Sequence, residues 1–250
     1  MRFIGKKVWI TGANTPVGSA LAVAMFAEGA KLRLSGVNTA PDGIEAECFP
    51  EEPETDDAAE KALAGWYDLD IYIHACRVVE RASLMDCTHV QWERSFNANL
   101  MTAYCGSLHA VRHIGKDRGG AMLYISSIHA EKPTGCAFLY SVAQGGITML
   151  MREASLDYGR LGIRVNSLLT GPIEGDINLF SSDSILLYDC AETKIPLGRL
   201  AVPEEIVKPA LFLCSDEASY VNGAVFQVDG GFTGYYLNGD PEGRWNNGRA

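Results

Sequence analysis

The sequence lacks the features of a secreted, membrane-spanning or nucleic-acid-binding protein. Its longest apolar runs fall short of the roughly eighteen residues that a membrane-spanning helix requires, and its start, MRFIGKKVWITG, has no secretion signal. Positive charge is scarce, since 21 basic and 31 acidic residues give a formal charge of −10, which would repel nucleic acid and anionic membranes. We therefore expect a soluble, cytoplasmic protein with no nucleic-acid or membrane partner.

Paired cysteines are also absent. The seven cysteines are odd in number and scattered singly, without the C-x-x-C spacing of a zinc ribbon or redox pair, so we interpret them as small core residues in a reducing compartment. His109 and His113 lie one helical turn apart, but no acidic or cysteine ligand is evident beside them. We expect no metal site and interpret these histidines as a surface or interface pair.

The 250 residues, 47% of them hydrophobic, suffice for one well-buried core. Short apolar, β-branched runs alternate with segments whose apolar positions recur at helical spacing. This alternation is typical of a doubly wound parallel α/β sheet with helices on both faces. The expected strands are 7–10, 31–34, 71–75, 121–126, 163–169 and 224–228. The expected helices are 17–29, 57–66, 90–115, 141–161 and 203–215, the last interrupted by Pro209.

Two segments depart from this alternation within the single domain that we expect over 1–250. Residues 176–198 follow the carboxyl end of a strand, where such folds place their ligand crevice, so we expect a substrate-lobe insertion there. Residues 235–250 are polar and turn-forming, which predicts a loosely held tail. Alternatively, the tail reaches a neighbouring subunit with its aromatic and basic side chains, which are Tyr235, Tyr236, Arg244, Trp245 and Arg249.

Six motifs have an order and spacing that resembles the short-chain dehydrogenase/reductase family over essentially the whole chain. They are TGANTPVG (11–18), NANL (97–100), ISS (125–127), Tyr140, RVNSLLTGP (164–172) and NGAVFQVDGG (222–231). The resemblance implies a Rossmann-like fold and hydride transfer to or from a nicotinamide. It also implies that Tyr140 transfers a proton, that Ser127 hydrogen-bonds the substrate oxygen, and that Asn99 helps to hold a water in the proton relay. Alternatively, these three residues only satisfy hydrogen bonds in a crevice.

The fourth member of the family's catalytic set is missing, because Gln144 stands where the family has a lysine. A phenol has an ordinary pKa of about 10, so proton transfer at neutral pH needs a nearby positive charge to favour the phenolate. Glutamine cannot supply that charge. By the resemblance, the lysine also binds the nicotinamide ribose, so its replacement predicts severe impairment of both functions.

The glycine-rich turn is incomplete as well. Gly12 and Gly18 match the family's first and last glycines, whereas Pro16 stands where the middle glycine lets the dinucleotide approach the backbone. Thr15 followed by Pro16 instead predicts a helix N-cap and a proline in the first turn. The helix start is therefore kept, while close approach of a nucleotide is disfavoured.

Further positions lack the cofactor contacts that the resemblance implies. Gly36 and Val37 stand where an acid or an arginine would bind the adenosine side, and Gly175 stands where a threonine would bind the nicotinamide carboxamide. Arg77 replaces a glycine beside the cofactor, where it either fills the empty cleft, as we favour, or pairs with an anionic ligand. The five carboxylates of segment 51–57 predict a solvated acidic loop that disfavours phosphates.

His129 is a further candidate, because it follows Ser127 by two residues. It is either a substitute acid near the crevice or, as we expect, a solvent-facing loop histidine. The cofactor-side departures at residues 16, 36–37, 77, 144 and 175, treated as five independent losses, predict that this chain binds no nicotinamide cofactor itself.

The segments that resemble the family's subunit interfaces keep long apolar faces, namely 90–111, 143–159 and 203–232. We therefore predict a non-catalytic subunit that assembles with an active, NAD-binding paralogue into a heterotetramer and supports the partner's site for a small-molecule substrate. Such a subunit is described in a hydroxyacyl-CoA dehydrogenase of anaerobic toluene degradation, which this chain resembles. Two alternatives stay open: an active NAD- or NADP-dependent dehydrogenase that uses Tyr140 and Ser127 without the lysine, and a homo-oligomeric protein that binds another small ligand.

Overall fold

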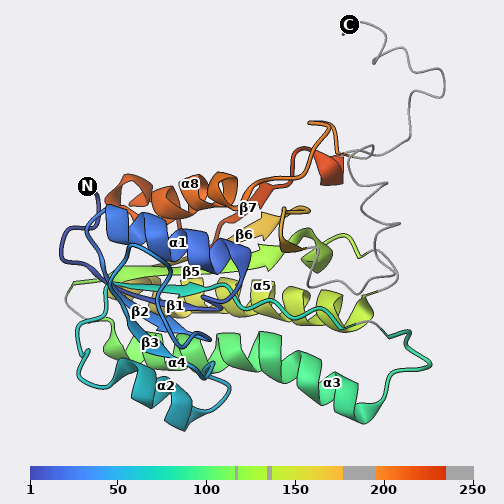
Figure 1. Cartoon of the computed structure of the whole chain (residues 1–250), viewed down its shortest axis with the longest axis horizontal. Coiled ribbons are helices and arrows are strands. Elements are labelled where there is room, and N and C mark those ends of the chain that lie inside the picture. Colours follow the sequence, from blue (N-terminus) through green and yellow to red (C-terminus); the bar gives the residue numbers. More distant parts are fainter. Residues whose placement is uncertain (81, 116–117, 134–136, 177–194, 235–250) are drawn as a thin grey trace, which may run out of the picture.

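The computed structural model describes residues 1–80, 82–115, 118–133, 137–176 and 195–234 (Figure 1). Within these residues, seven strands pair in parallel in the order β3-β2-β1-β4-β5-β6-β7. They are β1 (Lys7–Thr11), β2 (Lys31–Ser35), β3 (Glu47–Phe49), β4 (Ile71–His74), β5 (Gly120–Ser127), β6 (Ile163–Thr170) and β7 (Val225–Val228). The predicted single-domain, doubly wound Rossmann-like sheet is therefore confirmed. The strand order reverses between β1 and β4, and this is where such sheets bind ligands, beyond the strands' carboxyl ends.

Helices cover both faces of the sheet (Figure 1). One face carries α1 (Pro16–Ala27) and α8 (Pro203–Cys214), and the other carries α2 (Asp56–Leu63), α4 (Thr102–His113) and α5 (Phe138–Tyr158). A short helix, α3 (His89–Phe96), continues through a π-helical turn, Asn97–Met101, into α4. Such turns widen a helix locally and often occur at functional sites.

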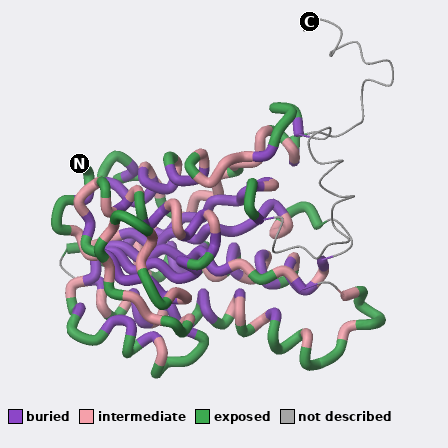
Figure 2. The backbone as a smooth tube through the Cα atoms, viewed as in Figure 1, coloured by how far each residue is buried: buried purple, intermediate pink, exposed green. Residues whose placement is uncertain are grey.

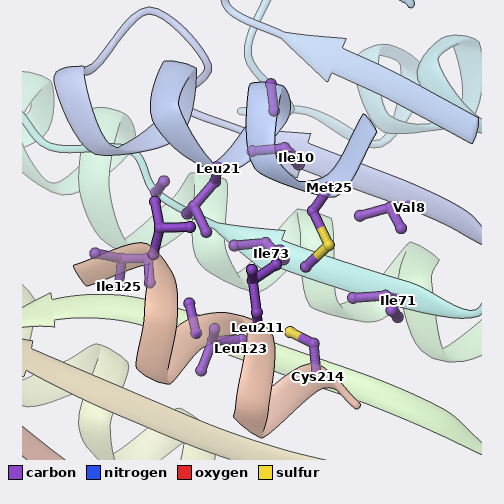
Figure 3. Packing of buried hydrophobic residues seen from close by; sticks show 14 of the residues in the cluster. Val8, Ile10, Leu21, Met25, Ile71, Ile73, Leu123, Ile125, Leu211 and Cys214 are labelled. Carbon is purple, nitrogen blue, oxygen red and sulfur yellow. The ribbon is translucent and has the colours of Figure 1, made fainter. Parts of the chain in front are cut away.

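Apolar side chains form two buried clusters, one on each face of the sheet. The buried residues accordingly lie in the centre of the fold (Figure 2). Val8 and Ile10 of β1 pack with Leu21 and Met25 of α1 on one face (Figure 3). Trp9, between them in the sequence, joins the second cluster on the opposite face, because successive side chains of a strand alternate. Burial of both faces explains why the strands have near-continuous apolar sequences.

The structure corrects two local expectations. The edge strand β3 was not predicted, because its three residues, Glu47–Phe49, are too short to show a pattern. Pro209 does not interrupt its helix, since α8 runs over Pro203–Cys214 with the proline inside. A proline removes one intrahelical hydrogen bond, but a helix whose other side chains are well packed against the protein continues through it.

Several expectations concern surfaces beyond the core. Within the described residues, no helix is both long and apolar enough to cross a membrane. The helices α4 and α5 keep exposed apolar side chains, including Tyr104, Met149 and Leu156, and their pairing with another subunit stays a prediction. The predicted tail, 235–250, and most of the predicted insertion, 177–194, lie outside the described residues.

Candidate active site

The glycine-rich turn after β1 is built as a helix start. Thr15 caps α1: its Oγ1 accepts a hydrogen bond from the Gly18 amide at 3.0 Å and donates to the Gly12 carbonyl at 2.8 Å. Pro16 occupies the first helical position. Gly12 has a φ of +73°, and a Cβ there would lie 2.3 Å from the backbone of Ala75, so only glycine fits. The predicted cap is therefore present, and it already uses one of the amides at the helix N-terminus.

Glu52 reaches this turn from the loop after β3. Its Oε1 accepts a hydrogen bond from the Gly12 amide at 2.9 Å, and a Cβ on Gly36 would lie only 2.0 Å from the same oxygen. Glycine at position 36 thus makes room for the carboxylate. Burial raises the pKa of Glu52 to about 7, although hydrogen bonds from the Cys76 thiol and the Gly12 amide act in the opposite direction. The expectation of a fully solvated acidic loop is wrong for this residue.

Two residues that differ from the family pattern, Pro16 and Gly175, lie close together at the glycine-rich turn. Gly175 has a φ of +85°, and a Cβ there would lie 3.1 Å from Cγ of Pro16. The glycine that replaces the family's threonine therefore passes close to the proline that replaces the family's glycine. Val37, by contrast, packs against the apolar cluster beneath α1.

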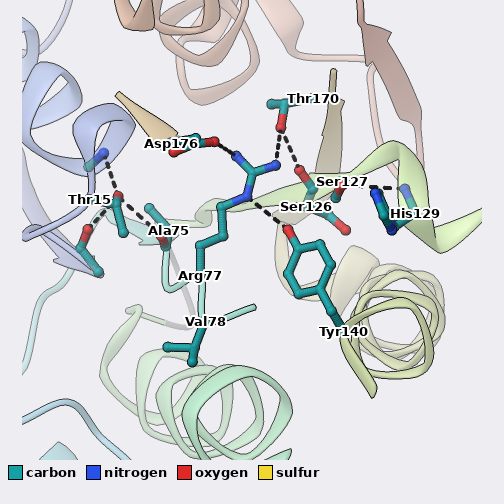
Figure 4. A network of polar contacts seen from close by, with 12 residues as sticks. Thr15, Ala75, Arg77, Val78, Ser126, Ser127, His129, Tyr140, Thr170 and Asp176 are labelled. Carbon is teal, nitrogen blue, oxygen red and sulfur yellow. Dashed lines mark hydrogen bonds and ion pairs between the residues drawn. The ribbon is translucent and has the colours of Figure 1, made fainter. Parts of the chain in front are cut away.

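Arg77, just past β4, extends across the carboxyl edge of the sheet to Tyr140 (Figure 4). Its Nε donates a hydrogen bond to the Tyr140 hydroxyl oxygen at 2.8 Å, and its Nη2 donates to Oγ1 of Thr170 at 3.1 Å. Its Nη1 forms an ion pair with Asp176. The Arg77 side chain is only 10% exposed, so this fork of contacts fixes a cation in a largely buried position.

Asp176 is buried beside that cation. Burial raises the pKa of its carboxyl group, while the charge and hydrogen bond of Arg77 act to lower it. Only Oδ2 contacts Arg77, and Oδ1 has no hydrogen-bond partner among the described residues. Sequence reasoning missed both Asp176 and Glu52, because nothing in their local pattern separates them from other acidic loop residues.

Gln144 occupies the lysine position on α5 and is fully buried. Its Oε1 accepts a hydrogen bond from Oγ of Ser126 at 2.7 Å, whereas its Nε2 has no partner in the part of the chain that is described. The amide thus carries no charge to Tyr140, as predicted from its chemistry, but both N–H groups of its Nε2 lack a partner within the described residues.

Ser127 and Tyr140 each contact His129. The backbone N–H of His129 donates to Oγ of Ser127 at 3.3 Å, and its ring centroid lies 5.4 Å from that of Tyr140. Burial, together with the charge of Arg77, lowers the pKa of His129 to about 4, so the imidazole is neutral at neutral pH. The expected solvent-facing histidine is therefore half-buried, and it carries no proton to act as an imidazolium acid.

Asn99 lies in the π-helical turn and holds the segment that carries Arg77. Its Oδ1 accepts from the Val78 amide at 3.0 Å, and its Nδ2 donates to the carbonyls of Val78 and Ser95, each at 2.8 Å. These three bonds use both N–H groups of the side chain and one lone pair of its oxygen, so Asn99 binds the backbone segment directly. Its predicted part in a water relay stays a prediction.

The histidines of α4 have separate partners. Nε2 of His109 lies 3.1 Å from the carboxylate of Asp56, and Nδ1 of His113 lies 2.8 Å from the carbonyl of His109. The expected surface or interface pair is wrong for His109, whose side chain is already only 1% exposed within this single chain. No group of three potential metal ligands gathers within the described residues.

Comparison with known proteins places this site in a family. Residues 12–233 match the family profile described as enoyl-(acyl carrier protein) reductase. An L-rhamnose 1-dehydrogenase (NAD(P)(+)) of Sphingomonas sp. is 30% identical over 252 residues, covering 94% of this chain and 97% of that one. The chain belongs to the short-chain dehydrogenase/reductase family.

Two further proteins are similar to this chain over most of its length. The 3-oxoacyl-[acyl-carrier-protein] reductase of Chlamydia trachomatis is 28% identical over 91% of this chain and 97% of its own. A solved structure from Thermus thermophilus superposes with a TM-score of 0.84 at 30% identity, covering 92% and 99% of the two chains. Because the relatives are named as dehydrogenases and reductases, the prediction of a non-catalytic subunit is wrong, and the alternative of an active enzyme fits better.

The nicotinamide dinucleotide that this short-chain dehydrogenase/reductase fold implies can be tested against the orphaned polar atoms. Oε2 of Glu52 is buried without a partner among the described residues, beside Gly12 and Gly36. It is suited to accept a hydrogen bond from a ribose hydroxyl. Nε2 of Gln144 is a buried donor at the position where, by the family resemblance, the lysine holds the nicotinamide ribose. Open hydrogen-bonding capacity at these two positions fits the group, although Pro16 withholds one backbone amide.

Proposed function

We propose that this short-chain dehydrogenase/reductase is an active NAD-dependent enzyme that interconverts a hydroxyl and a carbonyl group on a small-molecule substrate. The observation that carries the proposal is that Ser127 and Tyr140 both lie beside His129 at the carboxyl edge of the sheet, Ser127 at its backbone N–H and Tyr140 at its ring. The names of the relatives, a dehydrogenase and a reductase, support this reaction class.

Tyr140 moves the proton in this proposal. During oxidation the phenolate oxygen of Tyr140, which has first lost its own proton to solvent, accepts the proton of the substrate hydroxyl; during reduction the phenol donates its proton to the carbonyl oxygen and is left as the phenolate. Ser127 donates a hydrogen bond from Oγ to the same substrate oxygen, which strengthens as negative charge develops there. The neutral ring of His129 packs on Tyr140 without competing for the proton. A bound nicotinamide supplies the acceptor or donor of the hydride.

Glu52 favours NAD over NADP in this proposal. An ionised carboxylate accepts hydrogen bonds from ribose hydroxyls, whereas it repels the 2′-phosphate of NADP. The glycine at position 36 leaves the space that this carboxylate occupies, so the acid reaches the adenosine side from a different loop. The amide nitrogen of Gln144, which has no partner within the described residues, would donate to the second ribose.

The test is a steady-state assay of the purified chain with NADH or NAD and probes of several classes: an aldose, a hydroxy acid, a cyclic alcohol and a 3-oxoacyl thioester. The wild type should turn over at least one probe, and Tyr140→Phe should lower kcat by roughly a hundredfold or more, because it removes the proton-transfer group. Tyr104→Phe removes a hydroxyl from the exposed face of α4 and is the matched control. Wild-type inactivity toward all four classes would contradict the proposal.

A further inference from the structure

We infer that Arg77 is the positioning residue that supplies, from the end of β4, the positive charge that the family takes from a lysine on α5. The inference rests on the proposed function, since it concerns how Tyr140 is prepared for proton transfer. This role explains why an arginine stands at position 77, where the family has a glycine. It also explains how the charge can be absent at Gln144.

The lysine position itself cannot supply the charge. Gln144 lies one helical turn after Tyr140 on α5, where side chains four residues apart share a face. Its carbonyl oxygen is bound by Ser126, and its side chain is neutral. Tyr140 is only 1% exposed, so solvent does not stabilise a negative charge on its oxygen either.

The cation comes from the opposite side of Tyr140. Nε of Arg77 donates to the phenol oxygen at 2.8 Å, which is the length of a charge-assisted hydrogen bond. A hydrogen bond from a charged donor stabilises the oxygen more when it is negative, so it favours proton acceptance by Tyr140 from the substrate. The contact is made in a largely buried environment, where the effective dielectric constant is low and the attraction stronger than in water.

The guanidinium group is held in one orientation. Thr170 accepts from Nη2, and Asp176 binds Nη1 on the side of the fork away from Tyr140. Asp176 balances part of the positive charge, but it leaves Nε–H directed at the phenol oxygen. Asn99 clasps both backbone polar groups of Val78, the next residue, and so fixes where Arg77 leaves the loop.

A purely structural role for Arg77 gives a different expectation. In that case the arginine only neutralises Asp176, and its replacement lowers stability without changing kcat of the folded enzyme. A role through Tyr140 changes kcat more than KM, because the contact stabilises the transition state rather than the bound substrate. It also predicts that a lysine restores function wherever it brings an ammonium group to the phenol.

The experiment measures kcat and KM of the full-length chain with the probe that the wild type turns over, alongside chemical unfolding. Arg77→Gln should lower kcat by roughly a hundredfold with little change in KM. Adding Gln144→Lys to Arg77→Gln should recover at least about tenfold in kcat, because it returns a positive charge to the helix face that carries Tyr140. Arg77→Lys should lose less than Arg77→Gln, although an ammonium group lacks the planar fork.

Two further variants separate charge from folding. Arg77→Gln leaves the carboxylate of Asp176 buried without its cation. The double variant Arg77→Gln/Asp176→Asn removes both charges, so it should be more stable than Arg77→Gln while its kcat stays equally low. Arg94→Gln is the matched control, because Arg94 also pairs with a buried carboxylate, that of Glu80, through two hydrogen bonds. Its kcat should stay close to that of the wild type.

Each outcome decides a different question. Wild-type kcat in Arg77→Gln and in Arg77→Gln/Asp176→Asn overturns the inference and leaves the proposed function standing. A loss of kcat that neither lysine restores also overturns it, because the role would then not be one of charge. A wild-type chain without turnover overturns the proposed function, and the inference fails with it.

Discussion

Replacing Glu52 by glutamine tests whether a carboxylate is buried on the glycine-rich turn. The change keeps the size of the side chain and its ability to accept from the Gly12 amide, but it removes the charge. Burying the charged carboxylate lowers the free energy of unfolding at neutral pH, whereas burying a neutral side chain does not. Glu52→Gln should therefore stabilise the protein at neutral and alkaline pH, whereas it should have little effect in acid.

The size of the effect follows from the pKa. Burial raises the pKa of Glu52 from 4.5 to about 7, and each pH unit between these values is worth about 1.4 kcal/mol, so the charged form is disfavoured by at most about 3 kcal/mol. Because the folded-state pKa lies above the unfolded value, the folded state binds the proton of Glu52 more tightly than the unfolded state does. The stability that this protonation contributes is fully present below about pH 4.5. It is lost as the pH rises through about 7.

Urea unfolding of the wild type and Glu52→Gln, measured between acid and mildly alkaline pH, gives the difference in unfolding free energy at each pH. That difference should grow by about 3 kcal/mol across the range in favour of the variant. Glu51→Gln is the control, because the Glu51 side chain is 71% exposed on the same loop, and its pH curve should follow the wild type. Parallel curves for the wild type and Glu52→Gln would refute burial of this charge.

Two other predictions concern cofactor choice and the loop that carries Arg77. Calorimetry should show NAD binding at least about tenfold tighter than NADP, and Glu52→Gln should remove that preference; equal wild-type affinities would count against it. Asn99→Ala should lower the unfolding free energy by about 2 kcal/mol and slow turnover, because it removes three hydrogen bonds to Val78 and Ser95. Denaturation of Asn97→Ala, an exposed neighbour, provides the comparison, and an equal effect of both changes would contradict the prediction.

The sequence predicts the fold well because each strand and helix carries its own local pattern. Six of the seven strands of the described sheet are apolar runs that the alternation of patterns identifies. The helix start at Thr15 and Pro16 follows equally from local chemistry, since both residues act within one turn. Patterns of this kind need no knowledge of distant residues.

The site could not be predicted to the same extent, because its contacts join distant parts of the chain. Arg77 is separated by 63 residues from Tyr140 and by 99 from Asp176, and the three meet only when β4, β5 and β6 lie side by side. Likewise, the sequence does not say which of five acidic side chains in segment 51–57 turns inward. The departures from the family therefore read as independent losses in the sequence, whereas the structure places two of them, Pro16 and Gly175, side by side.

The contact between Gly36 and Glu52 has a consequence for engineering this chain. A side chain at position 36 and the present position of the carboxylate exclude each other, since a Cβ would come within 2.0 Å of Oε1. Any other residue at position 36 therefore displaces the end of the Glu52 side chain from the Gly12 amide, and it also strains a backbone whose φ is +85°. Restoring the family residue at position 36 thus changes two places at once, the second strand's end and the glycine-rich turn.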